Sequence, residues 1–228
     1  MQIVINKMPK STKFPNYIIP VANPEKAFHE EVDDKDFANC AHPSRIIFCG
    51  NPNSGKTLVI LNLLTHKKPP FEKIYLIHNN PYTTEYQDVD YELLEELPEI
   101  EDIDCSKKNL IIIEDVDYKT MSKEQRSLLD RYYGCFSTHN SVSIWLTAQD
   151  AVSIPCSVRR MANIVFVWKS NDVNHMSLLS TRFGLNSKEL KFIFDHYMTD
   201  LHDSLMIDGS RPYARFRKNI FEVLPIKY

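Results

Sequence analysis

The chain has 228 residues and a mass of 26.6 kDa, the size of one large domain or of one domain with a modest appendage. Hydrophobic residues make up 43% and charged residues 25%, and these ordinary globular values exclude a wholly disordered chain. Five scattered cysteines without a CxxC pair argue against a disulfide framework and a zinc site. No apolar run approaches the roughly 18 residues of a membrane span, and the first ten residues hold no continuous apolar segment. We therefore expect an intracellular protein with no membrane span and no secretion signal.

The formal net charge is −3, but the charges are unevenly distributed. Ten acidic residues and no basic one lie between Glu85 and Asp104, so the rest of the chain carries 27 basic against 20 acidic residues. A basic surface suits a polyanion, because each neutralised phosphate releases counterions. A solvated charged surface explains the same composition more simply. The acidic segment is expected to form one exposed helix or loop, with Leu93, Leu94 and Leu97 as its buried stripe.

The order of apolar runs and helical patterns predicts the fold class. Residues 1–40 are rich in proline and charge and are expected to form a short N-terminal arm over a single domain of residues 41–228. Short apolar runs predict strands over Arg45–Cys49, Lys73–His78, Leu110–Ile113, Val142–Thr147 and Ile164–Trp168. Helices are predicted over Lys56–His66, Lys123–Tyr133 and Ser187–Tyr197, and a C-terminal hairpin over Ser204–Ile207 and Ala214–Arg217. Strands that alternate with helices and are apolar on both faces predict an α/β fold, with a mostly parallel central sheet and helices on both faces.

A phosphate-binding motif follows the first strand. The motif G-x-x-x-x-G-K-[ST] is matched by Gly50, Asn51, Pro52, Asn53, Ser54, Gly55, Lys56 and Thr57. Gly50 and Gly55 allow consecutive backbone N–H groups to converge on phosphate oxygens at a helix N-terminus. Lys56 reaches the β- and γ-phosphates, and the Thr57 hydroxyl ligates Mg²⁺. The sequence therefore predicts a P-loop site for ATP and Mg²⁺.

Two adjacent acids, Glu114 and Asp115, end the third strand. In such sites one carboxylate holds Mg²⁺, partly through water, and an adjacent one polarises the attacking water. Successive side chains on a strand point in different directions, so the two roles are separable. The usual order is Asp for the metal and then Glu for catalysis, so assignment by residue type and assignment by position disagree. We favour position, with Glu114 near the metal and Asp115 near the water.

The following strand and loop hold further candidates. Gln149 follows the fourth strand and is the predicted γ-phosphate sensor, with Thr147 as the alternative. A sensor strand at this place in the chain fits NTPases with an additional central strand better than simple nucleotide kinases. Arg159 and Arg160 fit an arginine finger for a neighbouring subunit, and they equally fit a surface ion pair with the acidic segment. His139 fits a ligand or a base, although a lone histidine is more commonly a packed or surface residue.

These segments together resemble the genome-packaging ATPases of large double-stranded DNA viruses, the poxvirus-type branch of the FtsK/HerA superfamily of P-loop NTPases. The matching segments are Gly50–Thr57, Ile74–Pro81, Leu110–Asp115, Ser137–Gln149, Ile154–Trp168 and Ser204–Phe221. The resemblance implies a RecA-like ring ATPase that moves double-stranded DNA into a preformed capsid, with an arginine acting in trans. The Glu114–Asp115 pair departs from the Asp-Asp or Asp-Glu of the family, which leaves the catalytic carboxylate open.

The expected function is an ATP-hydrolysing DNA translocase that packages a viral genome. It would act as a pentameric or hexameric ring on double-stranded DNA of any sequence. Its further partner would be a capsid or portal protein, in the host cytoplasm, the viral factory or the virion. The His139 region and the basic C-terminal stretch are the candidates for DNA contact. The alternatives are a nucleoside or nucleotide kinase, whose arginine-rich lid would come from Arg159–Arg160 or from Arg211–Arg217, and a nucleotide-dependent switch that does not hydrolyse ATP.

Overall fold

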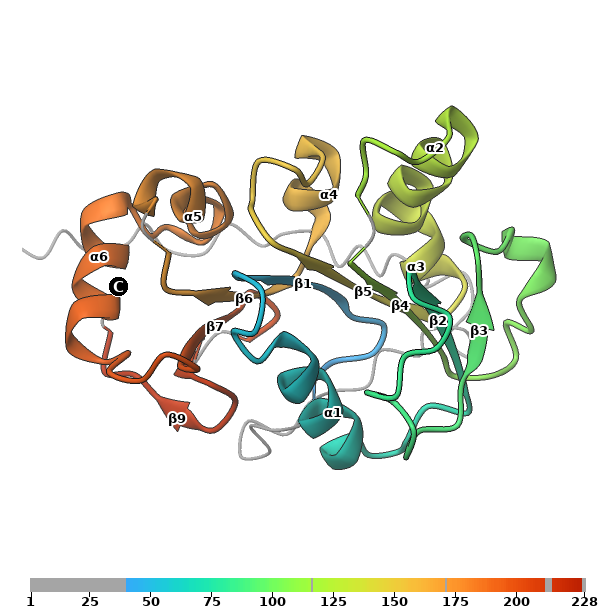
Figure 1. The fold of residues 1–228 in the computed structure, drawn as a ribbon, viewed down its shortest axis with the longest axis horizontal. Coiled ribbons are helices and arrows are strands. Elements are labelled where there is room, and N and C mark those ends of the chain that lie inside the picture. The colour runs from blue at the N-terminus through green and yellow to red at the C-terminus, as the bar shows by residue number, and fades with distance from the viewer. Residues whose placement is uncertain (1–39, 116, 171, 212–214, 227–228) are drawn as a thin grey trace, which may run out of the picture.

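The computed structural model of the protein describes residues 40–115, 117–170, 172–211 and 215–226, so the arm predicted for residues 1–40 lies outside them except for Cys40. Within these described residues, nine strands form one open sheet in the order β3-β2-β4-β5-β1-β6-β7-β8-β9 (Figure 1). The strands are β1 (Arg45–Cys49), β2 (Lys73–His78), β3 (Glu92–Leu94), β4 (Asn109–Glu114), β5 (Val142–Ala148), β6 (Ile164–Trp168), β7 (Ser204–Asp208), β8 (Phe216–Lys218) and β9 (Glu222–Val223). The helices are α1 (Lys56–His66), α2 (Lys123–Arg131), α3 (Ser137–His139), α4 (Cys156–Met161), α5 (Val173–Ser180) and α6 (Ser187–His196). A π-helical turn, Tyr132–Phe136, joins α2 to α3, and 3₁₀ turns form at Ile100–Asp102 and Thr181–Phe183.

The six strands from β3 to β6 in the sheet order are parallel, and β7, β8 and β9 are antiparallel to their neighbours. The prediction of a mostly parallel sheet is therefore confirmed. The predicted C-terminal hairpin is confirmed as well, because β7 and β8 pair antiparallel. It is also part of the main sheet, since β7 lies beside β6.

Apolar side chains cover both faces of the sheet. Along β4, Ile111 and Ile113 contribute to one hydrophobic cluster, and Leu110 and Ile112 contribute to the other. Successive side chains on a strand alternate between faces, which explains why a strand buried on both sides is a continuous apolar run. Helices α2, α4, α5 and α6 supply the first cluster and α1 the second, so helices lie on both faces as predicted (Figure 1).

Strand β5 lies between the phosphate-loop strand β1 and the acid-ending strand β4. Ile46 is in register with Trp145, and Ile111 with Ile144. The carboxyl ends of the three strands therefore meet at one edge of the sheet. The expected additional central strand is confirmed, and it brings three predicted site segments together.

The acidic segment from Glu85 to Asp104 differs from its prediction. Its middle forms the edge strand β3, which pairs with β2, and its end forms a 3₁₀ turn. Leu97 is buried, but Leu93 is 38% exposed, so the expected stripe is wrong for Leu93. The prediction of this stripe assumed a helical period. Because β3 pairs with β2, its successive side chains instead point to opposite faces of the sheet.

Candidate nucleotide and metal site

The segment Gly50–Thr57 links the end of β1 to the start of α1. The Gly50 N–H donates to the Ala148 carbonyl oxygen over 3.0 Å, which holds the loop against β5. A Cβ atom at Gly50 would lie 2.7 Å from Ser54 Oγ and 3.0 Å from Trp168, so the close backbone approach requires glycine. Gly55, at the N-cap of α1, has a φ of 98°, in the left-handed region that favours glycine.

The first turn of α1 is suited to an anion. Gly55 provides no side-chain acceptor for the first N–H groups of the helix, and that turn contains no acidic residue. Lys56 is buried, and its Nζ donates to the carbonyl oxygens of Gly50 at 2.9 Å and Asn51 at 3.1 Å. The lysine charge and the helix N-terminus therefore converge on the same short loop, as phosphate binding requires.

Glu114 contacts the P-loop threonine directly. The Thr57 hydroxyl donates to Glu114 Oε1 over 2.6 Å, and the buried Tyr86 hydroxyl donates to Oε2 of the same carboxylate. Burial raises the pKa of the Glu114 carboxyl above its ordinary value, while the hydrogen bonds from Thr57 and Tyr86 act in the opposite direction. A hydroxyl and a carboxylate in contact are the hard oxygen donors that Mg²⁺ prefers, so these residues fit the predicted ion.

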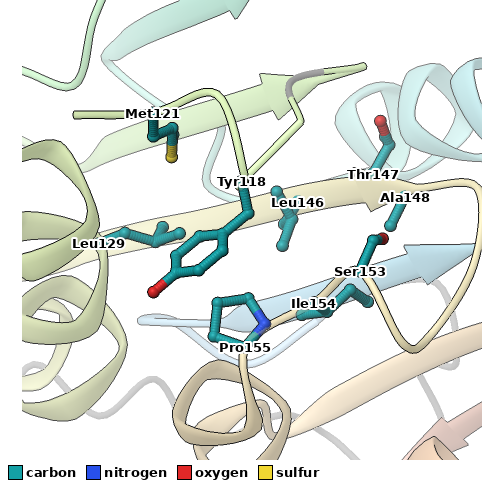
Figure 2. Close-up of a pocket in the computed structure, with 9 residues that line it drawn as sticks. All are labelled: Tyr118, Met121, Leu129, Leu146, Thr147, Ala148, Ser153, Ile154 and Pro155. Carbon is teal, nitrogen blue, oxygen red and sulfur yellow. The ribbon is translucent and has the colours of Figure 1, made fainter. Parts of the chain in front are cut away.

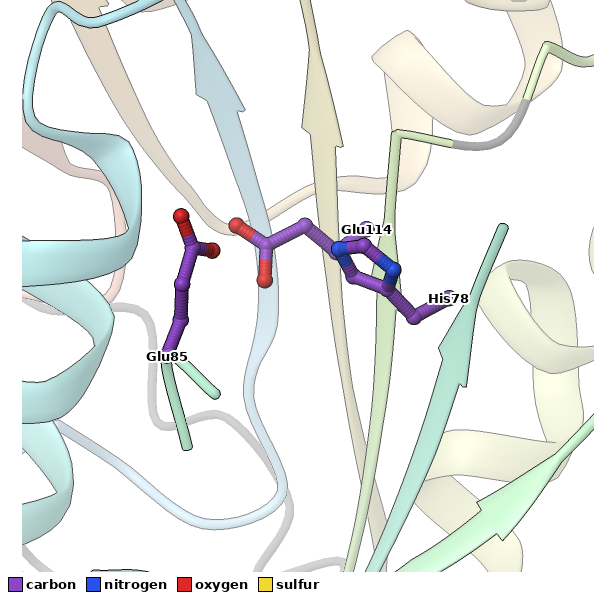
Figure 3. Close-up of side chains that lie close together, drawn as sticks. All are labelled: His78, Glu85 and Glu114. Carbon is purple, nitrogen blue, oxygen red and sulfur yellow. The ribbon is translucent and has the colours of Figure 1, made fainter. Parts of the chain in front are cut away.

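Two residues near Glu114 were not predicted from the sequence. The ligand atoms of His78, Glu85 and Glu114 all lie within 4.8 Å of one another, and the carboxylates of Glu85 and Glu114 face each other (Figure 3). Glu85 Oε2 also lies 3.4 Å from Thr57 Oγ1. Parallel pairing of β2 with β4 sets His78 beside Glu114. A sequence prediction that these two strands are neighbours would therefore have placed His78 near the metal site.

Asp115 points away from this contact. Its side chain is exposed and lines a cleft of about 270 Å³ together with Gln149, Thr147 and Asp117. The Asp115 backbone has a φ of 54°, which is uncommon for a residue other than glycine. Its N–H donates to the buried Thr147 hydroxyl over 3.0 Å. Glu114 and Asp115 thus face different sides of the strand tip, and Thr147 supports the backbone of Asp115.

A smaller pocket adjoins this cleft. Apolar side chains line most of it, including Tyr118, Leu146 and Pro155, and its volume is about 20 Å³ (Figure 2). That volume holds about one water molecule. The pocket is therefore too small for a nucleotide, and the polar cleft beside Asp115 is the larger of the two.

The two predicted finger arginines differ in their surroundings. Arg159 is half-buried in α4, and its Nη1 donates to the Ala151 carbonyl oxygen over 2.6 Å. Arg160 is exposed, and no hydrogen bond or ion pair links its side chain to another described residue. Within the described ranges, neither arginine pairs with the acidic segment. Arg160 is thus the better placed of the two to reach a neighbouring molecule.

The basic C-terminal stretch is largely unavailable for DNA contact. Arg211 and Arg217 are buried and pair with Asp208 Oδ2 at 3.1 and 2.9 Å, and Lys218 pairs with Asp203 at 2.8 Å. The prediction of a DNA-contacting stretch is therefore wrong for these residues. Charge counting missed this because a net count does not show that one carboxylate, Asp208, pairs with two buried arginines, nor that Asp203, which precedes the stretch, pairs with Lys218. His139, at the end of α3, is exposed.

His202 is another residue that the sequence did not indicate. Its Nδ1 lies 3.4 Å from the Ser54 carbonyl oxygen, and its own carbonyl accepts the indole N–H of Trp168 over 3.2 Å. The loop between α6 and β7 therefore lies against the P-loop, on the side opposite Glu114 in the strand order.

Comparison with known proteins gives no match to a protein-family model or to a curated sequence. Solved structures do match. The genome packaging NTPase B204 from Sulfolobus turreted icosahedral virus 2, in complex with ATP-gammaS, aligns with a TM-score of 0.53 at 14% identity, covering 86% of this chain and 100% of that one. B204, the DNA-packaging ATPase from Sulfolobus turreted icosahedral virus, gives 0.53 at 14% identity over 80% and 97%.

The pCW3 conjugation coupling protein TcpA, with ATPgS, gives a TM-score of 0.52 at 14% identity, covering 78% of this chain and 61% of that one. The resemblance to genome-packaging ATPases inferred from the sequence is confirmed at the level of the fold. The chain has the open, mostly parallel P-loop NTPase fold of the viral genome-packaging NTPases.

Proposed function

We propose that this protein is an ATP-hydrolysing translocase that moves double-stranded DNA into a preformed viral capsid. The observation that carries the proposal is the direct contact of Thr57 with Glu114 beside a P-loop, with Asp115 turned into the adjacent cleft. The fold shared with B204 and TcpA supports a nucleotide-driven motor that handles DNA.

In this mechanism the backbone N–H groups of Gly50–Thr57 and the Lys56 ammonium bind the phosphates of ATP. When bound, Mg²⁺ held by Thr57 and Glu114 would neutralise charge on the β- and γ-phosphates. Asp115 accepts the proton of the attacking water from the cleft side. Gln149, on the same cleft, orients that water and responds to loss of the γ-phosphate.

An arginine from a neighbouring subunit completes the site, and its exposure favours Arg160 over Arg159. This role requires a ring, which we propose to be a pentamer or hexamer.

DNA would be held through its phosphates without base readout, because a motor that packages a whole genome accepts every sequence. A capsid or portal protein is the proposed further partner. The proposed location is the host cytoplasm, the viral factory or the virion. No described helix has the length and apolarity that crossing a bilayer requires.

The structure gives less support to the alternative of a nucleoside or nucleotide kinase, which would need an arginine-rich lid. Arg211 and Arg217 would have to contact a phosphate acceptor, but they are buried against Asp208. The strand order, with β5 between β1 and β4, also fits the ring ATPases better.

The test is steady-state ATP hydrolysis with Mg²⁺, with and without long double-stranded DNA. We expect turnover that DNA stimulates, and a loss of at least about 100-fold in Lys56→Ala and Glu114→Gln, because each removes charge from the phosphate and metal site. Lys191→Ala and Glu101→Gln are matched controls at exposed positions and should keep wild-type rates. Turnover that needs a small phosphate acceptor would identify a kinase. An assembled ring that binds ATP without turnover would identify a switch.

A further inference from the structure

Three arginines gather at the end of the sheet where the parallel strands begin, opposite the nucleotide site. Arg45 is the first residue of β1. Arg182 belongs to the 3₁₀ turn after α5, and Arg215 precedes β8. Ile46 pairs with Ile164, Ile164 pairs with Asp208, and the Asp208 N–H donates to the Arg215 carbonyl oxygen over 2.8 Å, which sets the start of β1 near Arg215. We refer to Arg45, Arg182 and Arg215 as the arginine cluster.

Contacts through the turn before β6 hold the cluster together. The Arg45 N–H donates to Asn163 Oδ1 over 2.7 Å, and the Asn163 N–H donates to the Arg45 carbonyl over 2.9 Å. Arg182 Nη1 donates to the Ala162 carbonyl over 2.7 Å. The guanidinium carbons of Arg182 and Arg215 lie 5.6 and 5.9 Å from the centroid of the Phe183 ring. Burial lowers the pKa of the Arg182 guanidinium, and the nearby positive charge of Arg45 acts in the same direction.

No carboxylate among the described residues pairs with the cluster. Arg45 Nη1 donates to the Tyr133 carbonyl at 3.1 Å and to Thr138 Oγ1 at 3.3 Å, which are neutral oxygens. The contacts of the three guanidinium groups are to backbone oxygens, a hydroxyl and an aromatic ring, and none is to a described aspartate or glutamate; they come from Tyr133, Thr138, Arg159, Ala162 and Phe183. Asp208 is close in the chain, but its carboxylate already pairs with Arg211 and Arg217. Within the part of the chain that the structure describes, these three positive charges therefore have no acidic partner, and such a site attracts an anion.

We propose that the arginine cluster binds backbone phosphates of double-stranded DNA, an inference that rests on the proposed motor function. Guanidinium groups present a planar fork of donors that matches phosphate oxygens. Phosphate contacts carry no sequence information, as a genome-packaging motor requires. Because the cluster lies at the opposite end of the strands from Glu114, DNA and ATP bind without competing.

A single strand, β1, connects the arginine cluster to the P-loop. Strand β1 contains five residues, begins at Arg45 and leads directly into the P-loop at Gly50. Its length is about 17 Å at the usual rise of a strand. Strand β6, which follows Asn163, ends at Trp168, and Trp168 packs so close to Gly50 that a Cβ atom there would lie 3.0 Å from it. A force that DNA exerts on the arginine cluster would therefore be transmitted to the P-loop through β1 and β6, which are both buried.

The test compares the wild-type chain with an Arg182→Gln/Arg215→Gln variant. Fluorescence anisotropy measures binding of two labelled duplexes of unrelated sequence across a range of salt concentrations, with an ATP analogue present. We expect the variant to bind both duplexes at least about tenfold more weakly. The slope of log K against log[salt] should fall in magnitude by about 2, one for each lost phosphate contact. Arg182→Lys/Arg215→Lys, which retains the charge, should keep most of that slope.

The control is Lys188→Gln/Lys191→Gln, which removes two charges from exposed positions on α6 and should leave affinity and slope unchanged. DNA-independent ATP hydrolysis should be the same in all these proteins, which shows that they fold. If the Arg182→Gln/Arg215→Gln variant binds DNA like the wild type, the cluster proposal is wrong and the motor function stands. If it keeps DNA affinity but loses ATP-dependent assembly, the cluster contacts a neighbouring subunit instead. If the assembled wild type binds no duplex, the motor function fails as well.

Discussion

At the scale of single residues, Glu114 and Asp115 illustrate how structure separates two adjacent acids. Glu114 accepts hydrogen bonds from Thr57 and Tyr86, whereas Asp115 lines the cleft with Gln149. A left-handed backbone at Asp115 accompanies this change of direction. Strain of this kind is kept where the surrounding structure over-determines it, frequently at functional sites. The arrangement supports assignment by position over assignment by residue type.

Tyr86 is predicted to orient Glu114 for the metal. In Tyr86→Phe the carboxylate loses one of its two hydroxyl donors, and loss of such an orienting partner typically costs about 10–100-fold in metal affinity. We expect the Mg²⁺ concentration for half-maximal hydrolysis to rise about tenfold. Mg²⁺ titrations of ATP hydrolysis measure it. Tyr91→Phe is the control, because Tyr91 contacts the Tyr86 ring edge-on, with centroids 6.1 Å apart. An unchanged Mg²⁺ requirement in Tyr86→Phe would contradict this role.

The five cysteines are predicted to react at two different rates. Burial raises the pKa of both Cys40 and Cys49 to about 12, so at pH 8 these thiols stay protonated and covered. Cys105, Cys135 and Cys156 are exposed. A thiol reagent that gives a coloured product should therefore titrate three thiols rapidly in the folded protein and all five after denaturation. Rapid reaction of five thiols in the folded state would argue against this core.

At the scale of elements, the hairpin of β7 and β8 depends on a buried charge cluster. Asp208 sits between Arg211 and Arg217, and all three side chains are almost fully buried. Burial lowers the pKa of the Arg217 guanidinium, and the Asp208 charge opposes that change. Removal of the Asp208 carboxylate would leave these two buried cations without the negative charge that Asp208 supplies.

Asp208→Asn is therefore predicted to lower the free energy of unfolding by about 3–5 kcal/mol. Chemical denaturation measures the change. Asp195→Asn is the control, since Asp195 forms exposed pairs with Lys191 and Lys169, and it should cost less than about 1 kcal/mol. Equal effects of the two substitutions would show that the buried cluster contributes no more than a surface pair.

Whether a helix or strand could be predicted from the sequence depended on its length and on how far it is buried. The β1, β2 and β6 strands and the α1 helix have their predicted bounds, because short continuous apolar runs and a full helical pattern identify them. Helix α4 was missed, because six residues contain fewer than two turns of periodicity. The edge strand β3 was missed as well, because its acidic, three-residue sequence carries little strand signal and its pairing with β2 is a tertiary contact.

At the scale of the whole molecule, the arginine that we propose to act in trans would make activity a property of the assembly. We predict that Arg160→Gln alone and Lys56→Ala alone are both inactive, and that a mixture of the two regains activity. In the proposed ring the interfaces would be head-to-tail, so random mixing of equal amounts would give about a quarter of neighbouring pairs an intact P-loop facing an intact Arg160. Hydrolysis rates at varied mixing ratios measure the recovery. A mixture of Lys56→Ala with Glu114→Gln is the control, because both changes lie in the same site and neither subunit supplies an intact one.

The sequence by itself determined the P-loop, the strand that ends in Glu114 and Asp115, and the alternation of strands and helices that specifies the fold. These features are local, because each depends on the spacing and burial of residues within about a dozen positions. Only the tertiary structure decided that Glu114 contacts Thr57, 57 positions away, and Tyr86, 28 positions away. It also decided that Arg211, Arg217 and Lys218 pair with aspartates, while the three guanidinium groups of the arginine cluster contact no described carboxylate. Charge and hydrogen-bond partners depend on which strands lie side by side, and sheet order is not encoded in any single segment.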